Sequence, residues 1–358
     1  NFYELFYNYL PFFNSFRVPS MILIISNFCL YILCAYGLKD LSSYLIENNK
    51  KISYQMIMIT FFTISFFDIQ RIDFQIINPS EDSGQKSQMV SKEYFESIFF
   101  EDDTIKFLKE NLEYNRIYPA GSLFTDPKFK YHGIESVGGY HPAKFSHYAR
   151  LMSNTNNLLS IPVLQFLNVK YFISPAEINH PKLKFVKSSN FNSINGERII
   201  FIYELEGFTN KAWFVRNILP EDKNLFSYLN ADAFDPNRVA IVENLNEKKY
   251  AVGKVINLNR QIHMIEIKVD VKSEGFLVLS EINYPDRWKA YVDGKEYKVY
   301  QVNSVLRGIE LKKGDKSIIF EYDDSYFNNL YNFSKILTLS LLILLFIPHL
   351  MVLLNRKN

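Results

Sequence analysis

The stretch WKAYVDGKEY, residues 288–297, alternates apolar and polar side chains on both sides of Asp293-Gly294. An Asp-Gly pair between two alternating runs favours a two-residue hairpin turn, because both positions accept a positive φ. We therefore predict two antiparallel strands, at residues 288–292 and 296–301. This hairpin sets the fold class that we expect for the second half of the chain.

Similar alternating runs lie on both sides of the hairpin. They occupy residues 198–203, 212–216, 239–243, 255–258, 263–271, 275–281, 308–311 and 317–322. Lys313-Gly314-Asp315 adds a further turn signal between two of them. Many short strands at this spacing predict an antiparallel β-sandwich over residues 196–330.

The preceding region, residues 68–195, has a mixed α/β pattern. Asp102-Asp103-Thr104 favours the start of a helix, because acidic side chains cap and complement the positive end of a helix. A second helix is expected at residues 142–152, where Pro142 takes a first-turn position. Residues 169–174 read as a buried strand and residues 76–91 as a flexible loop.

Three apolar runs lie near the ends of the chain, at residues 21–38, 52–67 and 333–354. An apolar run of about 18 or more residues is long enough to cross a bilayer as a helix. The run at 52–67 is a shorter candidate, and Lys335 is the single formal charge in the three runs. The fold class predicted from the sequence is therefore an α+β membrane protein with three transmembrane helices. Residues 1–67 would form an outer aromatic loop and two of these helices, and residues 333–354 the last.

Basic residues near the apolar runs suggest an orientation. Lys39, Lys50 and Lys51 lie between the first two runs, and Arg356 and Lys357 follow the third. Since short cytoplasmic segments are enriched in Lys and Arg, we expect these segments in the cytoplasm. The large region from residue 68 to 332 would then be extracytoplasmic, in a multi-pass protein of the cell membrane.

Composition narrows the class of protein. The formal net charge is +2 and no basic run occurs, so a nucleic-acid partner is not expected. The two cysteines, Cys29 and Cys34, lie five residues apart on a predicted helix and face different directions. The chain begins at Asn1, within an aromatic segment, so we expect it to be the C-terminal portion of a longer polytopic protein.

Residues 280–290, SEINYPDRWKA, followed by VDGK at 292–295, resemble the C-terminal signature of the YfhO family of bacterial membrane proteins, roughly S-E-x-Y-Y-P-G-W-K-A then V-D-G-K. Four upstream blocks resemble the same family in the same order. They are FRVPS at residues 16–20, VGGYHP at 137–142, LNVKY at 167–171 and AWFV at 212–215. One departure stands out, because Asp286-Arg287 replaces the glycine that usually follows Tyr-Pro. The turn there must therefore be built differently.

The resemblance implies a function for the parent protein. YfhO-like proteins are similar to GT-C glycosyltransferases, which take a sugar from a polyprenyl-phosphate carrier and decorate cell-envelope polymers. The expected partners are thus a lipid bilayer, a polyprenyl-phosphate-linked sugar and an envelope polymer. The catalytic acid of such enzymes is expected upstream of this chain, so whether the chain belongs to an enzyme stays open and the chain alone would be inactive. The alternative is a non-catalytic envelope protein whose outer β-domain binds polysaccharide or a partner protein.

Within that implied function, a few residues are candidates for substrate binding. Arg17, Asp68 and Arg71 lie beside predicted helix ends, where the two arginines could bind a carrier phosphate; the alternative is that they are ordinary interfacial anchors. Trp288 and Tyr284 could stack on a sugar ring, although a Trp beside a proline turn more often fills the core of a sandwich.

No catalytic residue and no cofactor is identified. His132, His141 and His147 lack the spacing of a metal site, and packing or solvated histidines are the favoured interpretation. A divalent metal is compatible with the chemistry of the parent, where it would offset the charge of a leaving phosphate.

Overall fold

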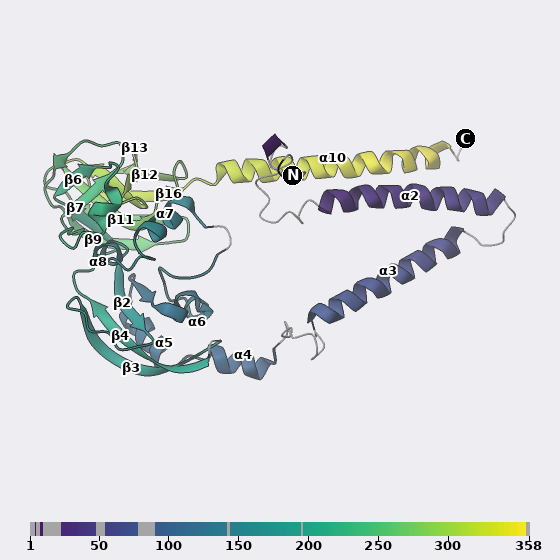
Figure 1. Ribbon diagram of the computed structural model, residues 1–358. Helices are drawn as coiled ribbons and strands as arrows, with labels where there is room; N and C mark the ends of the chain where they lie inside the picture. Colours follow the sequence, from purple (N-terminus) through teal and green to yellow (C-terminus); the bar gives the residue numbers. More distant parts are fainter. Residues whose placement is uncertain are drawn as a thin grey trace. The chain divides into compact units, whose positions relative to one another are not determined.

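The computed structural model describes residues 4, 8, 9, 23–47, 54–77, 90–141, 144–194 and 196–355 of the chain. The chain divides into two units, Asn1–Lys92 and Glu93–Asn358. Among the described residues, all the strands belong to the second unit (Figure 1).

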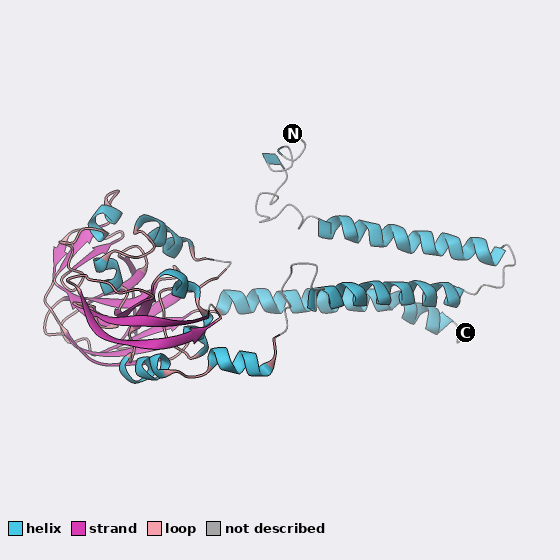
Figure 2. Cartoon of the chain, turned by 60° about the horizontal axis from the view of Figure 1, so that its bottom comes forward, coloured by secondary structure: helices cyan, strands magenta, loops and turns pink. Residues whose placement is uncertain are grey.

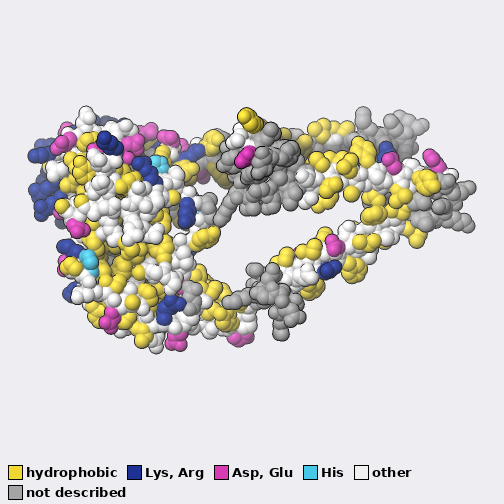
Figure 3. All heavy atoms as spheres, in the orientation of Figure 1, with side chains coloured by type: hydrophobic (Ala, Val, Ile, Leu, Met, Phe, Trp, Pro, Cys, Tyr) yellow, Lys and Arg dark blue, Asp and Glu magenta, His cyan; other side chains and the backbone are white. Residues whose placement is uncertain are grey.

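Two long helices, α2 (Leu23–Glu47) and α3 (Tyr54–Ile77), account for most of the first unit. Their sequences contain no proline and only one glycine, Gly37, so little in them opposes a continuous helix. Figure 3 shows hydrophobic side chains along both helices. Phe62 and Phe67 of α3 are among the exposed ones. Most of the predicted outer loop 1–20 and of the predicted loop 76–91 lies outside the described residues.

The prediction of three transmembrane helices is wrong. The three apolar runs fall largely within α2, α3 and α10 (Ser325–Asn355). Within the described ranges, however, no helix combines the length and the apolar character that a membrane crossing requires. Charged residues share these helices with the apolar runs, for example Lys39 in α2, Asp68 in α3 and Lys335 in α10.

A four-stranded sheet begins the second unit. Its strands are β1 (Arg116–Pro119), β2 (Val169–Ser174), β3 (Leu183–Ser193) and β4 (Gly196–Leu205), in the order β1-β2-β4-β3. β1 and β2 are parallel, and the other two pairs are antiparallel. The predicted strand at 169–174 is thereby confirmed as β2.

Helix α5 (Asp103–Asn111) packs against β3 and covers one side of this sheet (Figure 1). Asp102 is its N-cap and accepts a hydrogen bond from the backbone N–H of Ile105 at 3.0 Å, which confirms the predicted helix start. The Asp102 carboxylate also lies 2.6 Å from the Nζ atom of fully buried Lys128. One acid therefore satisfies both a helix terminus and a buried cation.

Shorter helices connect these elements. They are α4 (Lys92–Phe99), η4 (Gly121–Thr125), α6 (Pro127–Tyr131), α7 (Ser146–Asn154), α8 (Ile161–Phe166) and α9 (Leu225–Leu229). α7 covers most of the predicted helix at 142–152 but begins at Ser146, with Phe145 as its N-cap, and Pro142 lies outside the described residues. It matters for function because it carries one wall of the pocket described below.

Two further sheets follow, and their strands dominate the second unit in Figure 2. The five-stranded sheet has the order β13-β12-β16-β10-β9, and the seven-stranded sheet has the order β5-β11-β15-β14-β7-β6-β8. The strands are β5 (Ala212–Val215), β6 (Asn217–Pro220), β7 (Val239–Val242), β8 (Lys248–Lys249), β9 (Lys254–Arg260), β10 (Met264–Asp270), β11 (Gly275–Ile282), β12 (Trp288–Val292), β13 (Lys295–Tyr297), β14 (Tyr300–Val302), β15 (Leu306–Leu311) and β16 (Ser317–Tyr322).

One hydrophobic core lies between these two sheets. Ile265, Ile267 and Val269 alternate along β10 and face Leu277 and Leu279 of β11, with further buried residues from β12, β15 and β16. A second and larger core lies among the seven-stranded sheet, α8 and β2. Because β11 contributes to both cores, it is buried on both faces.

The prediction of a purely antiparallel sandwich over residues 196–330 is also wrong. β6 and β7 are parallel within the seven-stranded sheet, and β4 pairs with β2 and β3 in the four-stranded sheet. Alternation indicates that a segment forms a strand, but it does not indicate which other strand that segment pairs with. Strand pairing depends on contacts far along the chain.

The hairpin predicted at Asp293-Gly294 is confirmed. Val292 pairs with Lys295, and both turn residues have positive φ, 45° and 82°. Asp286, in the turn between β11 and β12, is also left-handed, with φ of 61°. Asp286 thus takes the conformation that glycine adopts most easily, which is how this chain builds its Tyr-Pro turn without glycine.

Candidate functional site

A pocket of about 830 Å³ opens in the second unit, between β1, η4 and α7. Its volume falls in the range typical of small-molecule sites. Five aromatic rings line it: Tyr118, Phe124, Tyr140, Phe145 and Tyr148.

Two of these tyrosines are fixed by partly buried hydrogen bonds. The Tyr118 hydroxyl donates to the carbonyl of Asn157 at 3.1 Å, and the Tyr148 hydroxyl donates to the carbonyl of Val137 at 2.7 Å. Burial raises the pKa of Tyr118 to about 12 and also raises the pKa of Tyr148. Both phenols therefore stay protonated and act as rigid walls.

Glycines bring a loop close to the aromatic wall. A Cβ atom at Gly138 would lie 2.5 Å from the Phe124 carbonyl oxygen, and Gly139 has a φ of 132°. The backbone N–H of Gly138 donates to the Ser136 hydroxyl at 3.0 Å. A side chain at position 138 would clash with Phe124, and a side chain at position 139 would be strained by the positive φ. The two glycines therefore let the loop lie close to Phe124, and the loop defines the shape of the pocket.

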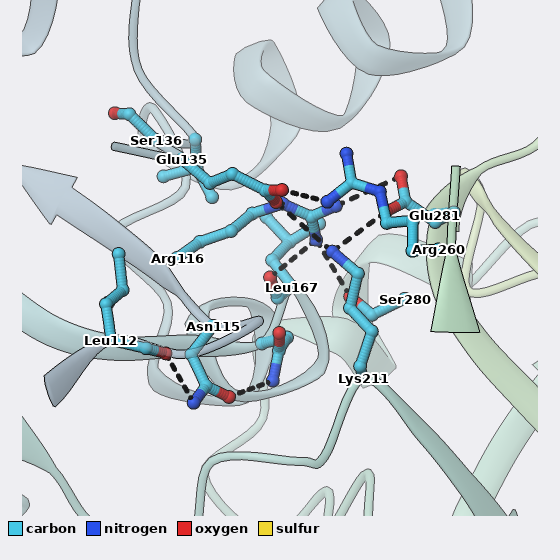
Figure 4. A network of polar contacts seen from close by, with 12 residues as sticks. Leu112, Asn115, Arg116, Glu135, Ser136, Leu167, Lys211, Arg260, Ser280 and Glu281 are labelled. Carbon is cyan, nitrogen blue, oxygen red and sulfur yellow. Dashed lines mark hydrogen bonds and ion pairs between the residues drawn. The ribbon is translucent and has the colours of Figure 1, made fainter. Parts of the chain in front are cut away.

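Arg116, at the start of β1, connects the pocket to a buried network of charged side chains (Figure 4). One Nη atom donates to the Leu167 carbonyl and to the Ser280 hydroxyl, each at 3.0 Å. Its Nε atom lies 3.6 Å from Glu135 and its other Nη atom lies 3.2 Å from Glu281. The guanidinium group is thus held on all sides.

Lys211 completes the centre of the network. Its Nζ atom lies 2.8 Å from Glu281 and 3.2 Å from Glu135. Burial, assisted by the positive charge of Arg116, lowers the pKa of Lys211 to about 8. Burial opposes ionisation of Glu281, but Arg116 and Lys211 outweigh it and lower the pKa of that carboxyl to about 2.

Two more arginines add positive charge. Arg260 pairs with Glu135 and lies 3.6 Å from Glu281 (Figure 4). Arg307 is buried and donates to the Ile282 carbonyl at 3.0 and 3.2 Å, and burial lowers its pKa to about 9. The two carboxylates are therefore outnumbered by the four cations, so the region behind the pocket carries excess positive charge.

The lining of the pocket has the same sign. Arg116, Lys130 and Lys144 line it, and among the described residues its lining contains no Asp or Glu. Lys130 and Lys144 are exposed, and neither forms an ion pair within the described part of the chain. The pocket thus combines aromatic surface with available cations, which suits a ligand with an apolar face and a negative group.

Of the binding residues predicted from the sequence, the structure describes Asp68, Arg71 and Trp288. Arg17 lies outside the described residues, and Asp68 and Arg71 lie exposed on α3 in the first unit. Trp288 lines a different hollow of about 460 Å³. Its ring packs against the core between the two β-sheets and lies 3.6 Å from the Arg307 guanidinium, so Trp288 is a partly buried packing residue with one edge toward that hollow.

The three histidines have separate surroundings. A ring nitrogen of His132 lies 2.8 Å from the carbonyl oxygen of Phe99, and a ring nitrogen of His147 lies 3.0 Å from the Gln301 amide. His141 lines the pocket. Across the described ranges, no three His, Cys, Asp or Glu side chains come together as metal ligands would.

Sequence reasoning missed the charged network. Arg116, Glu135 and Lys211 lie in three short segments that show no common spacing. The one available signal was Glu281, an acid that follows the buried run Phe276–Ser280 inside the resemblance to YfhO. A charge at the end of a fully buried strand requires a partner, and this expectation points to a buried cation.

Comparison with known proteins gives one family. Residues 237–333 match the model of the family described as bacterial membrane protein YfhO. No curated protein matches the chain. The cryo-EM structure of arabinofuranosyltransferase AftD from mycobacteria is similar over 35% of this chain and 8% of that chain, with 14% sequence identity and a TM-score of 0.17. This chain therefore matches a small part of that protein, and agreement at this level does not establish a common fold.

The family match contains β7 to β16 together with the Tyr-Pro turn and the Asp293-Gly294 hairpin. It also contains three members of the charged network, Arg260, Glu281 and Arg307. The resemblance found in the sequence is thereby confirmed for residues 237–333, which are similar to the family of the bacterial membrane protein YfhO, whereas the four upstream blocks lie outside this match.

Proposed function

We propose that the unit Glu93–Asn358 binds a negatively charged saccharide of the bacterial cell envelope, as the acceptor-binding part of a glycosyltransferase-like protein. The observation that carries the proposal is the pocket itself, in which five aromatic rings surround a space lined by cations and no acids. Sugar rings present C–H faces that pack on aromatic rings, and their carboxylate or phosphate groups pair with Lys and Arg.

The fixed parts of the pocket support binding without rearrangement. Tyr118 and Tyr148 are held by hydrogen bonds, and the Arg116 guanidinium is held by Glu135 and Glu281. Groups that are already ordered lose little entropy when a ligand binds. Lys130 and Lys144 are exposed at the same pocket and supply the adjustable contacts.

The place of this unit in a larger reaction is part of the same proposal. A glycosyltransferase-like parent would take the sugar from a polyprenyl-phosphate carrier and transfer it to the polymer held by this unit. The pocket residues then orient an acceptor, and we assign them no step in the transfer. The membrane-protein family match is what supports an envelope setting.

The test is a binding titration of the purified full chain with an acidic disaccharide, the uronate-containing repeat of hyaluronan, and with neutral chitobiose. We expect the acidic disaccharide to bind more tightly. Tyr140 is 64% exposed, so a Tyr140→Ala variant should fold normally and bind about three- to tenfold more weakly. The matched control is Tyr114→Ala, an exposed tyrosine outside the pocket. Equal binding of both disaccharides, or equal loss in both variants, would contradict the proposal.

A further inference from the structure

Two smaller hollows continue from the pocket along the surface of the same unit. The first, of about 440 Å³, shares Phe145 with the pocket. The second, of about 460 Å³, shares Pro285 and Asp286 with the first. Hollows that share a lining side chain are neighbours, so the three hollows form a series along the surface, which we call the track.

Aromatic rings occur in every part of the track. The Phe145 and Tyr284 rings meet at the middle hollow, with centroids 5.4 Å apart. Trp288, Tyr297 and Tyr300 line the last hollow. Repeated aromatic platforms along a surface are suited to successive sugar rings, because each ring presents its own apolar face.

The middle of the track is rigid. The backbone N–H of Arg287 donates to the Tyr284 carbonyl at 3.2 Å, and the backbone N–H of Asp323 donates to the Arg287 carbonyl at 2.6 Å. The left-handed Asp286 closes this turn. A hydrogen bond of 3.0 Å between Gln301 and His147 also ties the lining of the last hollow to that of the middle one. Tyr284 is therefore presented from a fixed backbone.

The charge changes along the track. Among the described residues, the pocket is lined by Lys and Arg without acids, whereas the two smaller hollows together are lined by three acidic residues and three Lys or Arg residues. These six residues, whose charges balance, are Glu243, Asp286, Glu296, Arg287, Lys289 and Lys298. A chain that places one negative group in the pocket would extend its further sugar units over a surface where acidic and basic side chains balance.

From these observations we infer that the bound saccharide is a linear chain that extends from the pocket past Tyr284 to Trp288, with at least three binding subsites. This inference rests on the proposed function, because it assumes that the pocket binds saccharide. It assigns the Tyr-Pro turn, which lies within the YfhO match, a binding role as the middle subsite.

The test compares hyaluronan oligosaccharides of two and six sugar units in titrations of the full chain. A six-unit chain offers about three registers for a two-unit site, so about threefold tighter binding would arise from statistics alone. We expect a gain of more than tenfold. Tyr284→Ala should remove about three- to tenfold of the affinity for the hexasaccharide and leave disaccharide binding unchanged. The control is Tyr228→Ala, a tyrosine of similar exposure outside the three hollows.

The outcomes separate the two proposals. Disaccharide binding in the pocket with no more than the statistical gain for the hexasaccharide would overturn the track and leave the proposed function standing. The same holds if Tyr284→Ala binds the hexasaccharide as the parent does. Failure of both oligosaccharides to bind would contradict the proposed function, and the track with it.

Discussion

The Nη2 atom of Arg116 lies 3.2 Å from Glu281, so an ion pair joins β1 of the four-stranded sheet to β11 of the seven-stranded sheet. Both side chains are mostly buried, and both also contact Glu135 or Lys211. The same pair therefore holds two sheets together and positions the guanidinium that lines the pocket. Its removal should affect stability and binding together.

Arg116→Met should lower the free energy of unfolding by about 3 kcal/mol, because Glu281 and Glu135 lose a buried partner. Urea unfolding followed by fluorescence measures this change. Lys106→Met is the control, since its pair with Asp103 is exposed and 4.0 Å long and should contribute less than about 0.5 kcal/mol. Similar losses for the two variants would show that the network does not support the fold.

Acid should destabilise the protein partly through Glu281. Its pKa falls from 4.5 to about 2 on folding, so its contribution is complete above about pH 4.5 and is lost as the pH falls toward 2. The shift corresponds to about 3 kcal/mol. Urea midpoints at pH 5 and pH 3 should therefore differ more for the parent than for Glu281→Gln. The same difference in both proteins would rule out this contribution.

Lys211 should act at the alkaline end, where its contribution to stability also rises with pH. Its pKa falls from 10.5 to about 8 on folding, so between these values the unfolded chain binds more protons than the folded chain. Stability from this group therefore rises with pH across that window. Lys211→Met should show a smaller rise between pH 8 and pH 10 than the parent, measured by chemical denaturation. A parent and variant with parallel pH profiles would contradict the assignment.

Gly138→Ala should disturb the pocket wall. The added methyl group would lie 2.5 Å from the Phe124 carbonyl oxygen, and such overpacking costs about 1–3 kcal/mol. Thermal unfolding measures the loss. Gly37→Ala is an informative comparison, because no atom lies within 4 Å of its Cβ position in α2 and alanine favours a helix. If Gly138→Ala were as well tolerated, the loop could not be as close to Phe124 as described.

Trp288→Ala should destabilise the fold by about 3 kcal/mol. The ring packs against the core between the two β-sheets and covers the Arg307 guanidinium, so its loss leaves a gap and exposes a buried cation. The unfolding temperature of the full chain is the measurement. An unchanged unfolding temperature would show that the Trp288 ring lines the hollow without contributing to the packing of the core.

Local signals in the sequence were reliable and long-range pairing was not. The Asp102 cap and the Asp293-Gly294 turn were predicted because each depends on neighbours within a few residues. The parallel pairing of β6 with β7 and the place of β4 in the first sheet depend on contacts that alternation does not encode. The three apolar runs form helices, as expected. The length of each run, however, did not show that the described helices lack the apolar character that a membrane crossing requires.

The candidate site shows the same difference between local signals, which the sequence reveals, and long-range contacts, which it does not. Trp288 was found because it lies in a recognisable motif, yet its ring serves mainly in packing. Arg116, Glu135 and Lys211 come from three separate segments, and only the folded chain brings them to Glu281. A site assembled from single residues on distant elements leaves no spacing pattern for sequence analysis to detect.

The most direct test of the account is a structure of the full chain bound to the hyaluronan hexasaccharide. The account predicts ligand density in the pocket, with a carboxylate within hydrogen-bonding distance of Lys130, Lys144 or Arg116 and a sugar ring against Tyr140. Density confined to another surface of the chain, or an empty pocket at saturating ligand, would contradict the central claim that this pocket binds an anionic saccharide.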